Sequence, residues 1–433
     1  MPGRSRMNES RSTGKPFEIS KWLIWEAYRR VAANKGAAGV DGVSIEQYEQ
    51  NLENNLFKLW NRMSSGSYFP PPVKAVEIPK AGGRGVRVLG VPTVEDRVAQ
   101  TAAAMALERE VEPIFHPDSY GYRPKRSALD AVGACRTRCW RSDWVIDLDI
   151  RAFFDSVDHD LMVKAVERHV TWDTRWVLLY VRRWLVAPLA RAGVDPAARD
   201  RGTPQGSAIS PVLANLFMHY AFDTWLAREC PGVTFERYCD DAVIHCGSRE
   251  QAEHVRTALA VRSAAVGLEL HPDKTRIVYC KDDDRRGEFE HTSFTFLGYT
   301  FRPRLAKNRD GKHFVSFLPA VSKDAIKAMG REIRSWHISR RSDRTLHDLA
   351  RMFNSVIAGW INYYGRFYKS MLYPLLRRIN EHLVRWACRK FKKLRRREQR
   401  ARELLAGTAR RQPWLFAHWK FGLKPDGWTM GAV

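Results

Sequence analysis

Residues 233–246 read VTFERYCDDAVIHC and place two adjacent acids between two runs of strand-forming residues. The runs 233–238 and 242–246 are rich in β-branched and aromatic side chains, which is typical of strands. The short connection between them predicts a β-hairpin with Asp240 and Asp241 at its tip. Paired aspartates usually belong to an ordinary polar turn, but such a turn does not require acids between two strong strands.

A second predicted strand carries two more acids. Residues 144–150 (WVIDLDI) are β-rich, and Asp147 and Asp149 share one face because side chains alternate with a period of two. Phosphoryl transfer with two metal ions requires carboxylates from different elements, since Mg²⁺ prefers hard oxygen ligands. Asp240 and Asp241 with one acid of this strand meet that requirement. The spacing does not decide between Asp147 and Asp149.

The composition restricts the class of partner. The 433 residues are enough for two or three packed units, and 44% are hydrophobic, so disorder does not explain the net charge of +24. A polyanion is the natural partner: nucleic acid fits best, and an anionic membrane surface is the alternative. No run of about 18 apolar residues occurs, so we expect a bacterial-type cytoplasmic protein with no membrane partner.

The seven cysteines are odd in number and scattered, which predicts reduced thiols rather than a disulfide framework. Cys135 and Cys139 are four residues apart and could hold a metal ion on one helix. No second Cys or His pair follows at zinc-finger spacing, so we predict no zinc site.

A hairpin is also predicted in the N-terminal half. Residues 73–78 and 86–91 read as strands, and the Gly-rich stretch between them predicts the turn. This pairing would bring Lys80 and Arg87 near one another.

Helices are predicted on both sides of residue 300. Ser210 followed by Pro211 predicts an N-cap that opens a helix to about residue 228. After a boundary at 318–322 we expect long basic helices, since nine of the 14 residues in 389–402 are Lys or Arg.

Tyr238-Cys239-Asp240-Asp241 resembles the Tyr-x-Asp-Asp box of reverse transcriptases. Further boxes of that family occur in the family's order: 149–155 (DIRAFFD) for motif A, 202–211 (GTPQGSAISP) for motif B, 270–275 (LHPDKT) for motif D and 296–299 (FLGY) for the primer grip. The complete series is far more specific than the four-residue box alone.

The subfamily is indicated near the two ends. Residues 34–42 (NKGAAGVDG) are similar to the N-terminal extension of group II intron proteins, and 359–364 (GWINYY) resembles their maturase domain. The blocks 78–80 with 87–92 and 115–124 also resemble that subfamily's fingers, so the resemblance covers roughly residues 20–420.

Two departures from the family pattern are visible. Cys239 stands where group II proteins usually have alanine, which puts substrate preference in doubt but not polymerisation. The paired cysteines and histidines of an HNH nuclease do not occur after Trp419, so we expect no DNA endonuclease activity.

The resemblance implies an α+β fold: a right-hand polymerase whose fingers and palm combine antiparallel sheet with helices, followed by an α-helical thumb. The expected ranges are 1–17 for a flexible basic arm, 18–319 for the reverse transcriptase fingers and palm with the N-terminal extension, 320–406 for the thumb/maturase (X) domain and 407–433 for a short C-terminal tail.

The resemblance also implies that Asp149, Asp240 and Asp241 are catalytic and bind two Mg²⁺ ions, with Mn²⁺ as an alternative metal. This favours Asp149 over Asp147, which becomes a structural acid. The implied reaction is attack of a primer 3′-hydroxyl on the α-phosphate of a dNTP.

The implied nucleotide-binding residues are Lys80, Arg87, Phe154, Gln205 and Lys274. Phe154 would act as a steric gate against a 2′-hydroxyl, and Lys80 and Arg87 would neutralise the triphosphate. Gln205 would contact the nucleotide or the template. Lys274 would approach the leaving pyrophosphate, although an ordinary surface lysine is an equally good interpretation.

Two more groups are implied beyond the palm. The primer grip would consist of Phe296, Leu297, Gly298 and Tyr299, and an RNA-binding surface of Trp360, Tyr363, Tyr364, Arg366, Arg395, Arg396 and Arg397. An aromatic stripe buried in a helical bundle and a solvated basic helix face are the alternatives for that surface.

The expected partners are structured intron RNA, an RNA template with a DNA or RNA primer, dNTPs and target DNA, in a protein that assists splicing and retromobility. One alternative is a domesticated group II-like reverse transcriptase in phage defence or another host role. A second is an RNA-binding maturase without polymerase activity. An RNA-dependent RNA polymerase is disfavoured by Phe154.

Overall fold

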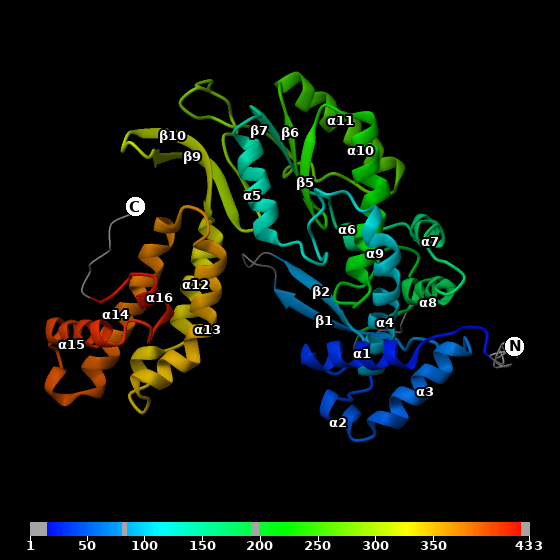
Figure 1. Cartoon of the computed structure of the whole chain (residues 1–433), viewed down its shortest axis with the longest axis horizontal. Helices are drawn as coiled ribbons and strands as arrows, with labels where there is room; N and C mark the ends of the chain where they lie inside the picture. Colours follow the sequence, from blue (N-terminus) through cyan, green and yellow to red (C-terminus); the bar gives the residue numbers. More distant parts are fainter. Residues whose placement is uncertain (1–14, 80–84, 192–198, 426–433) are drawn as a thin grey trace, which may run out of the picture. The chain divides into compact units, whose positions relative to one another are not determined.

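The computed structural model describes residues 15–79, 85–191 and 199–425 (Figure 1). The chain divides into two compact units: the first contains residues 1–127, 148–242 and 253–275, and the second contains 128–147, 243–252 and 276–433. Positions 1–14 of the predicted basic arm lie outside the described residues.

The N-terminal part of the first unit is built around one buried helix. It contains α1 (Lys21–Ala33), α2 (Ile45–Glu49), α3 (Leu52–Ser64), β1 (Val73–Pro79), β2 (Val86–Val91), α4 (Val94–Val111) and the 3₁₀ turn η1 (Glu112–Ile114). Helix α4 is apolar around most of its circumference, with Val98, Ala102 and Leu107 fully buried, so it packs against several elements at once. The predicted hairpin is confirmed, since β1 and β2 pair antiparallel with Ile78 opposite Arg87.

The remaining part of the first unit is mainly helical. It contains α6 (Phe153–Ser156), α7 (His159–Glu167), α8 (Arg175–Val186), β4 (Leu189–Ala190), α9 (Ser210–Met218), the π-helical turn η2 (His219–Asp223), α10 (Thr224–Glu229), β5 (Thr234–Tyr238) and most of α11 (Arg249–Ala265). Strand β4 joins β1 in parallel, which gives a three-stranded sheet of order β2-β1-β4.

The helix predicted to open at Ser210 differs in two details. Ile209 is its N-cap and Ser210 its first residue, so the predicted N-cap is wrong by one position. The physical reason is that the Ser210 hydroxyl lies 2.7 Å from the Thr203 hydroxyl and donates to the Pro204 carbonyl at 3.0 Å, and so binds the preceding loop. The helical run reaches Glu229 but widens into a π turn at His219–Asp223.

The two strands of the predicted acidic hairpin, β5 and β6 (Asp241–Cys246), belong to a four-stranded sheet. The sheet also contains β3 (Trp144–Leu148) and β7 (Arg276–Tyr279), and its order is β5-β6-β3-β7. Strand β3 ends at Leu148, so Asp149 is the first residue beyond it, whereas Asp147 stands opposite Arg276 in the β3–β7 pair.

The second unit combines a small sheet with a helical bundle. It contains α5 (Ala128–Cys139), β8 (Phe294–Phe296), β9 (Tyr299–Lys307), β10 (His313–Val321), α12 (Lys323–Ser335), η3 (Ile338–Arg340), α13 (Leu346–Tyr364), η4 (Lys369–Leu372), α14 (Tyr373–Lys390), η5 (Lys392–Leu394), α15 (Glu398–Arg411) and α16 (Ala417–Lys420). The change from sheet to helices at Ser322, which caps α12 through its hydroxyl, lies within the predicted boundary of 318–322.

Helices α12 to α16 gather in one bundle (Figure 1), whose core includes Ile333, Leu349 and Leu376. Phe416 and Trp419 are buried in the same core. Helix α15 continues across residue 406, where the predicted tail begins. The described part of that tail packs into the bundle, because burial of two large aromatic side chains is favourable.

Strands and helices in both units confirm the predicted α+β class. Among residues 15–79, 85–191 and 199–425, no helix is both long and apolar enough to cross a membrane. All seven cysteines fall in these ranges and are free thiols.

Candidate active site

The tip of the β5–β6 hairpin carries the acidic pair. Cys239 is buried and has a left-handed backbone with φ of 62°, and Asp241 is the first residue of β6. Burial raises the pKa of Asp240, and the negative charge of Asp149 raises it further. Asp241 is exposed, but partial desolvation of its carboxyl group by the surrounding protein, followed by repulsion from Asp240 and Asp149, raises its pKa to about 7. The three carboxylates therefore form one electrostatically coupled group.

Asp149 is fixed by the motif D segment. Its amide nitrogen donates to the Thr275 hydroxyl at 3.3 Å, and its carbonyl accepts from the His271 amide at 2.8 Å. The Lys274 ammonium lies 3.2 and 3.3 Å from the two carboxylate oxygens of Asp149. The structure thus places Lys274 beside a proposed metal ligand, and its charge also lowers the pKa of Asp241.

Phe154 lies at the junction of motifs A and B. Its ring is half-buried and packs edge to face on Phe153, 5.3 Å between centroids, while Phe153 itself is buried in the core. The Phe154 carbonyl accepts from the Thr203 amide at 2.7 Å. Gly202 has φ of 77°, and a Cβ there would lie 2.7 Å from the Phe154 carbonyl oxygen, so this contact requires glycine.

The motif B loop is also attached to the fingers hairpin. The Gln205 carbonyl accepts from the Gly90 amide of β2 at 2.7 Å, and a Cβ on Gly206 would lie 2.7 Å from the Gly90 carbonyl oxygen. Arg87 of the same strand is exposed, and its positive charge lowers the pKa of both Asp240 and Asp241. Lys80 lies outside the described residues.

Residues 78–301 match the family described as reverse transcriptase (RNA-dependent DNA polymerase), and these 224 residues are more than half of the 433 in the chain. The chain belongs to the reverse transcriptase family. Residues 326–404 match the maturase-specific domain of group II introns, so this reverse transcriptase is of the group II intron type and is an RNA-directed DNA polymerase. Reverse transcriptases use divalent metal ions and act on nucleic acids.

Curated relatives agree with this assignment. Protein YkfC of Escherichia coli is 33% identical over 328 residues, which cover 67% of this reverse transcriptase and 81% of YkfC. The group II intron-encoded protein LtrA of Lactococcus lactis subsp. cremoris is 29% identical over 197 residues, which cover 46% of this chain and 32% of LtrA. The alignment therefore spans about a third of LtrA.

The sequence did not reveal a buried polar network that supports motif B of the reverse transcriptase. The Gln100 side-chain oxygen accepts from the Ser207 hydroxyl at 2.6 Å and from the Ala208 amide at 2.8 Å. The Asp96 carboxylate in turn accepts from the side-chain amide nitrogen of Gln100 at 2.9 Å, and burial raises the pKa of Asp96 to about 6. The available signal was an acid and an amide four residues apart in an Ala-rich helix.

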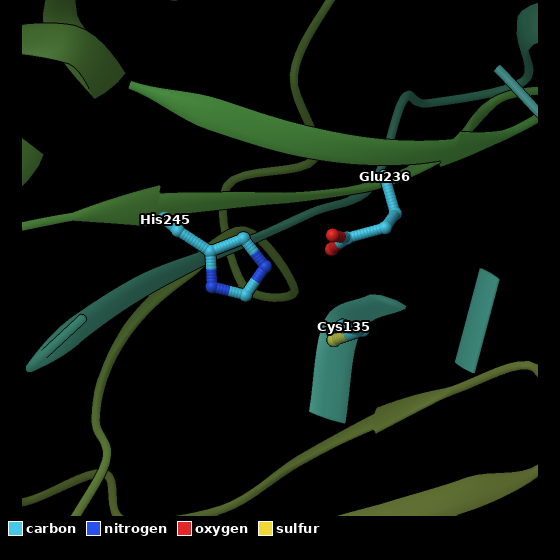
Figure 2. Close-up of side chains that lie close together, drawn as sticks. All are labelled: Cys135, Glu236 and His245. Atoms are coloured by element: carbon cyan, nitrogen blue, oxygen red, sulfur yellow. The ribbon is translucent and has the colours of Figure 1, made fainter. Parts of the chain in front are cut away.

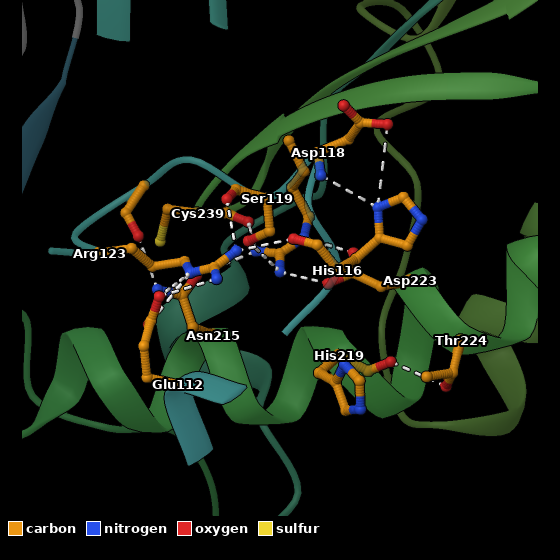
Figure 3. A network of polar contacts seen from close by, with 12 residues as sticks. Glu112, His116, Asp118, Ser119, Arg123, Asn215, His219, Asp223, Thr224 and Cys239 are labelled. Carbon is orange, nitrogen blue, oxygen red and sulfur yellow. Dashed lines mark hydrogen bonds and ion pairs between the residues drawn. The ribbon is translucent and has the colours of Figure 1, made fainter. Parts of the chain in front are cut away.

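A second network that the sequence did not reveal lies under the acidic turn (Figure 3). Arg237 and Asp223 are both fully buried and form an ion pair of 2.6 Å. Beside the turn, Tyr122 is exposed with φ of 55°, and its ring centroid lies 5.9 Å from that of Tyr238. An arginine inside the predicted strand 233–238 was the available signal for the network.

The predicted primer grip of the reverse transcriptase belongs to the second unit. Leu297 and Gly298 have φ of 49° and 77° and form the turn between β8 and β9. The Tyr363 hydroxyl donates to the Leu297 carbonyl at 2.8 Å, and the Tyr299 hydroxyl donates to the Tyr363 carbonyl. A Cβ on Gly298 would lie 2.8 Å from the Tyr364 hydroxyl, so the tyrosines of α13 pack directly on this turn.

The predicted RNA-binding groups differ in exposure. Trp360 stacks on Trp336 with 5.4 Å between ring centroids and 7° between planes, and it packs against the bundle core. Tyr363 and Tyr364 pack on the primer-grip turn, whereas Arg366 and the arginines 395–397 are exposed. The geometry thus favours packing for the aromatic stripe and leaves the arginines facing solvent.

Cys135 belongs to a small group of potential metal ligands (Figure 2). One ligand atom each of Cys135, Glu236 and His245 lies within 4.8 Å of the others, and all three residues are buried. Cys139, the neighbour considered from spacing, is not in the group. Each of the three takes part in a polar or electrostatic interaction within the protein, so we assign no metal ion to them.

Proposed function

We propose that this reverse transcriptase copies a group II intron RNA into DNA and binds that RNA to assist splicing and retromobility. The observation that carries the polymerase part is the electrostatic coupling of the three aspartates: Asp149 raises the pKa of both Asp240 and Asp241, and Asp240 raises the pKa of Asp241. The match to the maturase-specific domain and the name of the Lactococcus relative support the intron part.

We infer that the three aspartates hold two Mg²⁺ ions, with Mn²⁺ as an alternative. The donor set fits, because three carboxylates supply hard oxygen ligands and a cation between them relieves the repulsion that raises the pKa values of Asp240 and Asp241. Bound metals would activate the primer hydroxyl and stabilise the departing pyrophosphate. Lys274, already against Asp149, supplies a further positive charge at the same place.

The nucleotide is proposed to lie between motifs A and B. Arg87 is placed to neutralise triphosphate charge, and Lys80 is proposed for the same role from its sequence position. Phe154, fixed by the bond from Thr203 to its carbonyl, would exclude a 2′-hydroxyl and so select dNTPs over rNTPs. Gln205 would contact the nucleotide or the template beside it.

Intron RNA, a primed RNA template and target DNA are the proposed nucleic acid partners. The exposed arginines 395–397 and Arg366 would contact phosphates, which suits a chain with a net charge of +24. The primer grip of Phe296, Leu297, Gly298 and Tyr299 would hold the primer strand. We place this activity in the cytoplasm, near the nucleoid.

The test is primer extension on an RNA template with dNTPs and Mg²⁺. Asp240→Ala removes one proposed metal ligand and should abolish product without loss of folded protein. Asp160→Ala, at an exposed position in the first turn of α7, is the matched control and should retain activity. Replacing dNTPs with rNTPs in the same assay tests the alternative of an RNA polymerase.

Each outcome has a clear meaning. Product from wild type and Asp160→Ala but not from Asp240→Ala supports the proposed metal site. If the well-folded wild type gives no product while it binds intron RNA, the protein is an RNA-binding maturase and the polymerase proposal is wrong.

A further inference from the structure

A buried ion pair beneath the acidic turn makes many contacts, and a contribution to the stability of the fold does not account for them. The Arg237 guanidinium binds Asp223 at two points, with Nε 2.7 Å from Oδ1 and Nη2 2.6 Å from Oδ2. Removing two charges from water costs several kcal/mol each, and apolar replacements of such pairs are often as stable. We therefore looked for what else the pair holds in place.

Arg237 uses every donor that it has. Beyond Asp223, Nη1 donates to the Asn215 side-chain oxygen at 3.1 Å and to the Cys239 carbonyl at 2.8 Å, and Nη2 donates to the Ser119 hydroxyl at 2.8 Å. A guanidinium has five N–H groups in a rigid planar fork, so these five bonds fix its orientation completely. The Cys239 carbonyl is thereby attached to a rigid group.

The Cys239 carbonyl belongs to the peptide that leads into Asp240. Cys239 has φ of 62°, and a non-glycine residue keeps such a backbone only when its surroundings impose it. The bond from Arg237 is one such constraint, because it acts on the peptide plane between Cys239 and Asp240. Rotation of that plane would redirect the Asp240 carboxyl group.

The π turn explains how Asp223 reaches Arg237. His219–Asp223 widens an otherwise α-helical run, and the Thr224 hydroxyl donates to the His219 carbonyl at 2.8 Å within the widened turn. Asp223 is its last residue and is fully buried. Single π turns inside α-helices occur frequently at functional sites, where they change the direction of a side chain.

We propose that Arg237 and Asp223 are positioning residues of the metal-binding turn: the ion pair fixes the Cys239 carbonyl and, through it, the carboxylate of Asp240. This inference rests on the proposed metal site but adds residues that lie behind it. Neither residue contacts substrate or metal in this role. Their effect should therefore appear in metal dependence rather than in template binding.

The experiment compares Asp223→Asn and Arg237→Lys with wild type in primer extension at varied Mg²⁺ concentration. Groups that orient metal ligands typically change metal affinity or activity by about tenfold to hundredfold when replaced. We expect the Mg²⁺ concentration for half-maximal rate to rise by about tenfold, with the KM for primed template unchanged. Mg²⁺ requires nearly ideal octahedral geometry, so a displaced ligand weakens its binding. Mn²⁺ is less demanding than Mg²⁺ in this respect and should restore part of the rate.

The matched control is Arg123→Lys in the neighbouring ion pair of Figure 3. Arg123 binds Glu112 at 2.8 Å and the carbonyls of His116 and Ser119, but no bond to the turn is among these contacts. Loss of this pair should lower the melting temperature and leave the Mg²⁺ dependence as in wild type.

A second variant covers failure to fold. Ser119→Ala removes one bond to Arg237 without leaving a buried charge and should raise the half-maximal Mg²⁺ concentration by a smaller factor. The inference is overturned if the folded variants lose melting temperature but keep the wild-type Mg²⁺ dependence. An inactive but folded wild type would instead refute the proposed function itself.

Discussion

Replacing Gly121 with alanine should displace the turn of Cys239, Asp240 and Asp241, which is the proposed metal site. A Cβ at this position would lie 2.5 Å from the Cys239 nitrogen and 3.0 Å from the Tyr238 carbonyl carbon, and both are backbone atoms. The backbone of Gly121 is also fixed in place, since its carbonyl accepts from the side-chain amide of Asn215 at 2.6 Å. Ordinary contacts begin near 3.5 Å, so one backbone must move by about 1 Å.

The size of the effect follows from that displacement. A shift of about 1 Å at reacting groups costs about 100-fold in rate, which corresponds to about 2.7 kcal/mol of activation free energy. The introduced methyl group should also lower the free energy of unfolding by about 1–3 kcal/mol. Steady-state primer extension measures the first quantity, and thermal unfolding measures the second.

Gly359→Ala is the matched control for the same change in a different place. Gly359 lies inside α13, and a Cβ there would meet no atom within 4 Å. Alanine should stabilise this helix by up to about 1 kcal/mol and leave polymerisation unchanged. The reasoning is refuted if Gly121→Ala retains activity within about threefold of wild type, a change of less than 1 kcal/mol.

Three further predictions concern the nucleotide, the RNA and pH. Phe154→Ala should reduce the preference for dNTPs over rNTPs by about tenfold to hundredfold in kcat/KM, and an unchanged ratio would remove its role as a gate. Replacing the arginines 395–397 with alanine should make the slope of log affinity for intron RNA against log salt shallower by about 2 to 3, and an unchanged slope would place the RNA elsewhere. His418 is fully buried, its Nε2 lies 2.8 Å from the Asn380 side-chain oxygen, and burial lowers its pKa from 6.5 to about 3. Below pH 6.5 the folded state therefore binds fewer protons than the unfolded state. The free energy of unfolding has its full value above that pH and falls by up to about 1.4 kcal/mol per pH unit toward pH 3. Thermal unfolding of His418→Gln should lack this pH dependence.

Local patterns predicted much of the candidate site, because strand alternation and turn chemistry depend on near neighbours. The hairpin that carries Asp240 and Asp241 follows from such a pattern. The choice between Asp147 and Asp149 did not, since both point to one side of a continuous strand. The structure distinguishes them through the strand end at Leu148 and the bonds from 271–275 to Asp149, which involve residues more than 100 positions away.

Periodicity could not reveal the π turn or the fate of the aromatic stripe. A widened turn at His219–Asp223 adds one residue to a helix whose apolar pattern reads as continuous. The partner of Asp223 is Arg237 on strand β5, a pairing that local spacing does not encode. The stripe around Trp360 suits base stacking and core packing equally well, and only the position of Trp336 favours packing.

The attachment of Asp149 to Thr275 also has a consequence for the order of folding. The two residues are 126 positions apart, and an isolated bridge between Ile150 and Leu270 closes the same large loop. Because loop closure must precede such contacts, structures that depend on them form late, whereas the local helices of the N-terminal part need no such closure. During synthesis, a chain that has passed Asp241 already carries all three aspartates of the proposed metal site. It cannot assemble them until the segment ending at Thr275 has emerged from the ribosome, so the candidate active site is among the last parts of its unit to form.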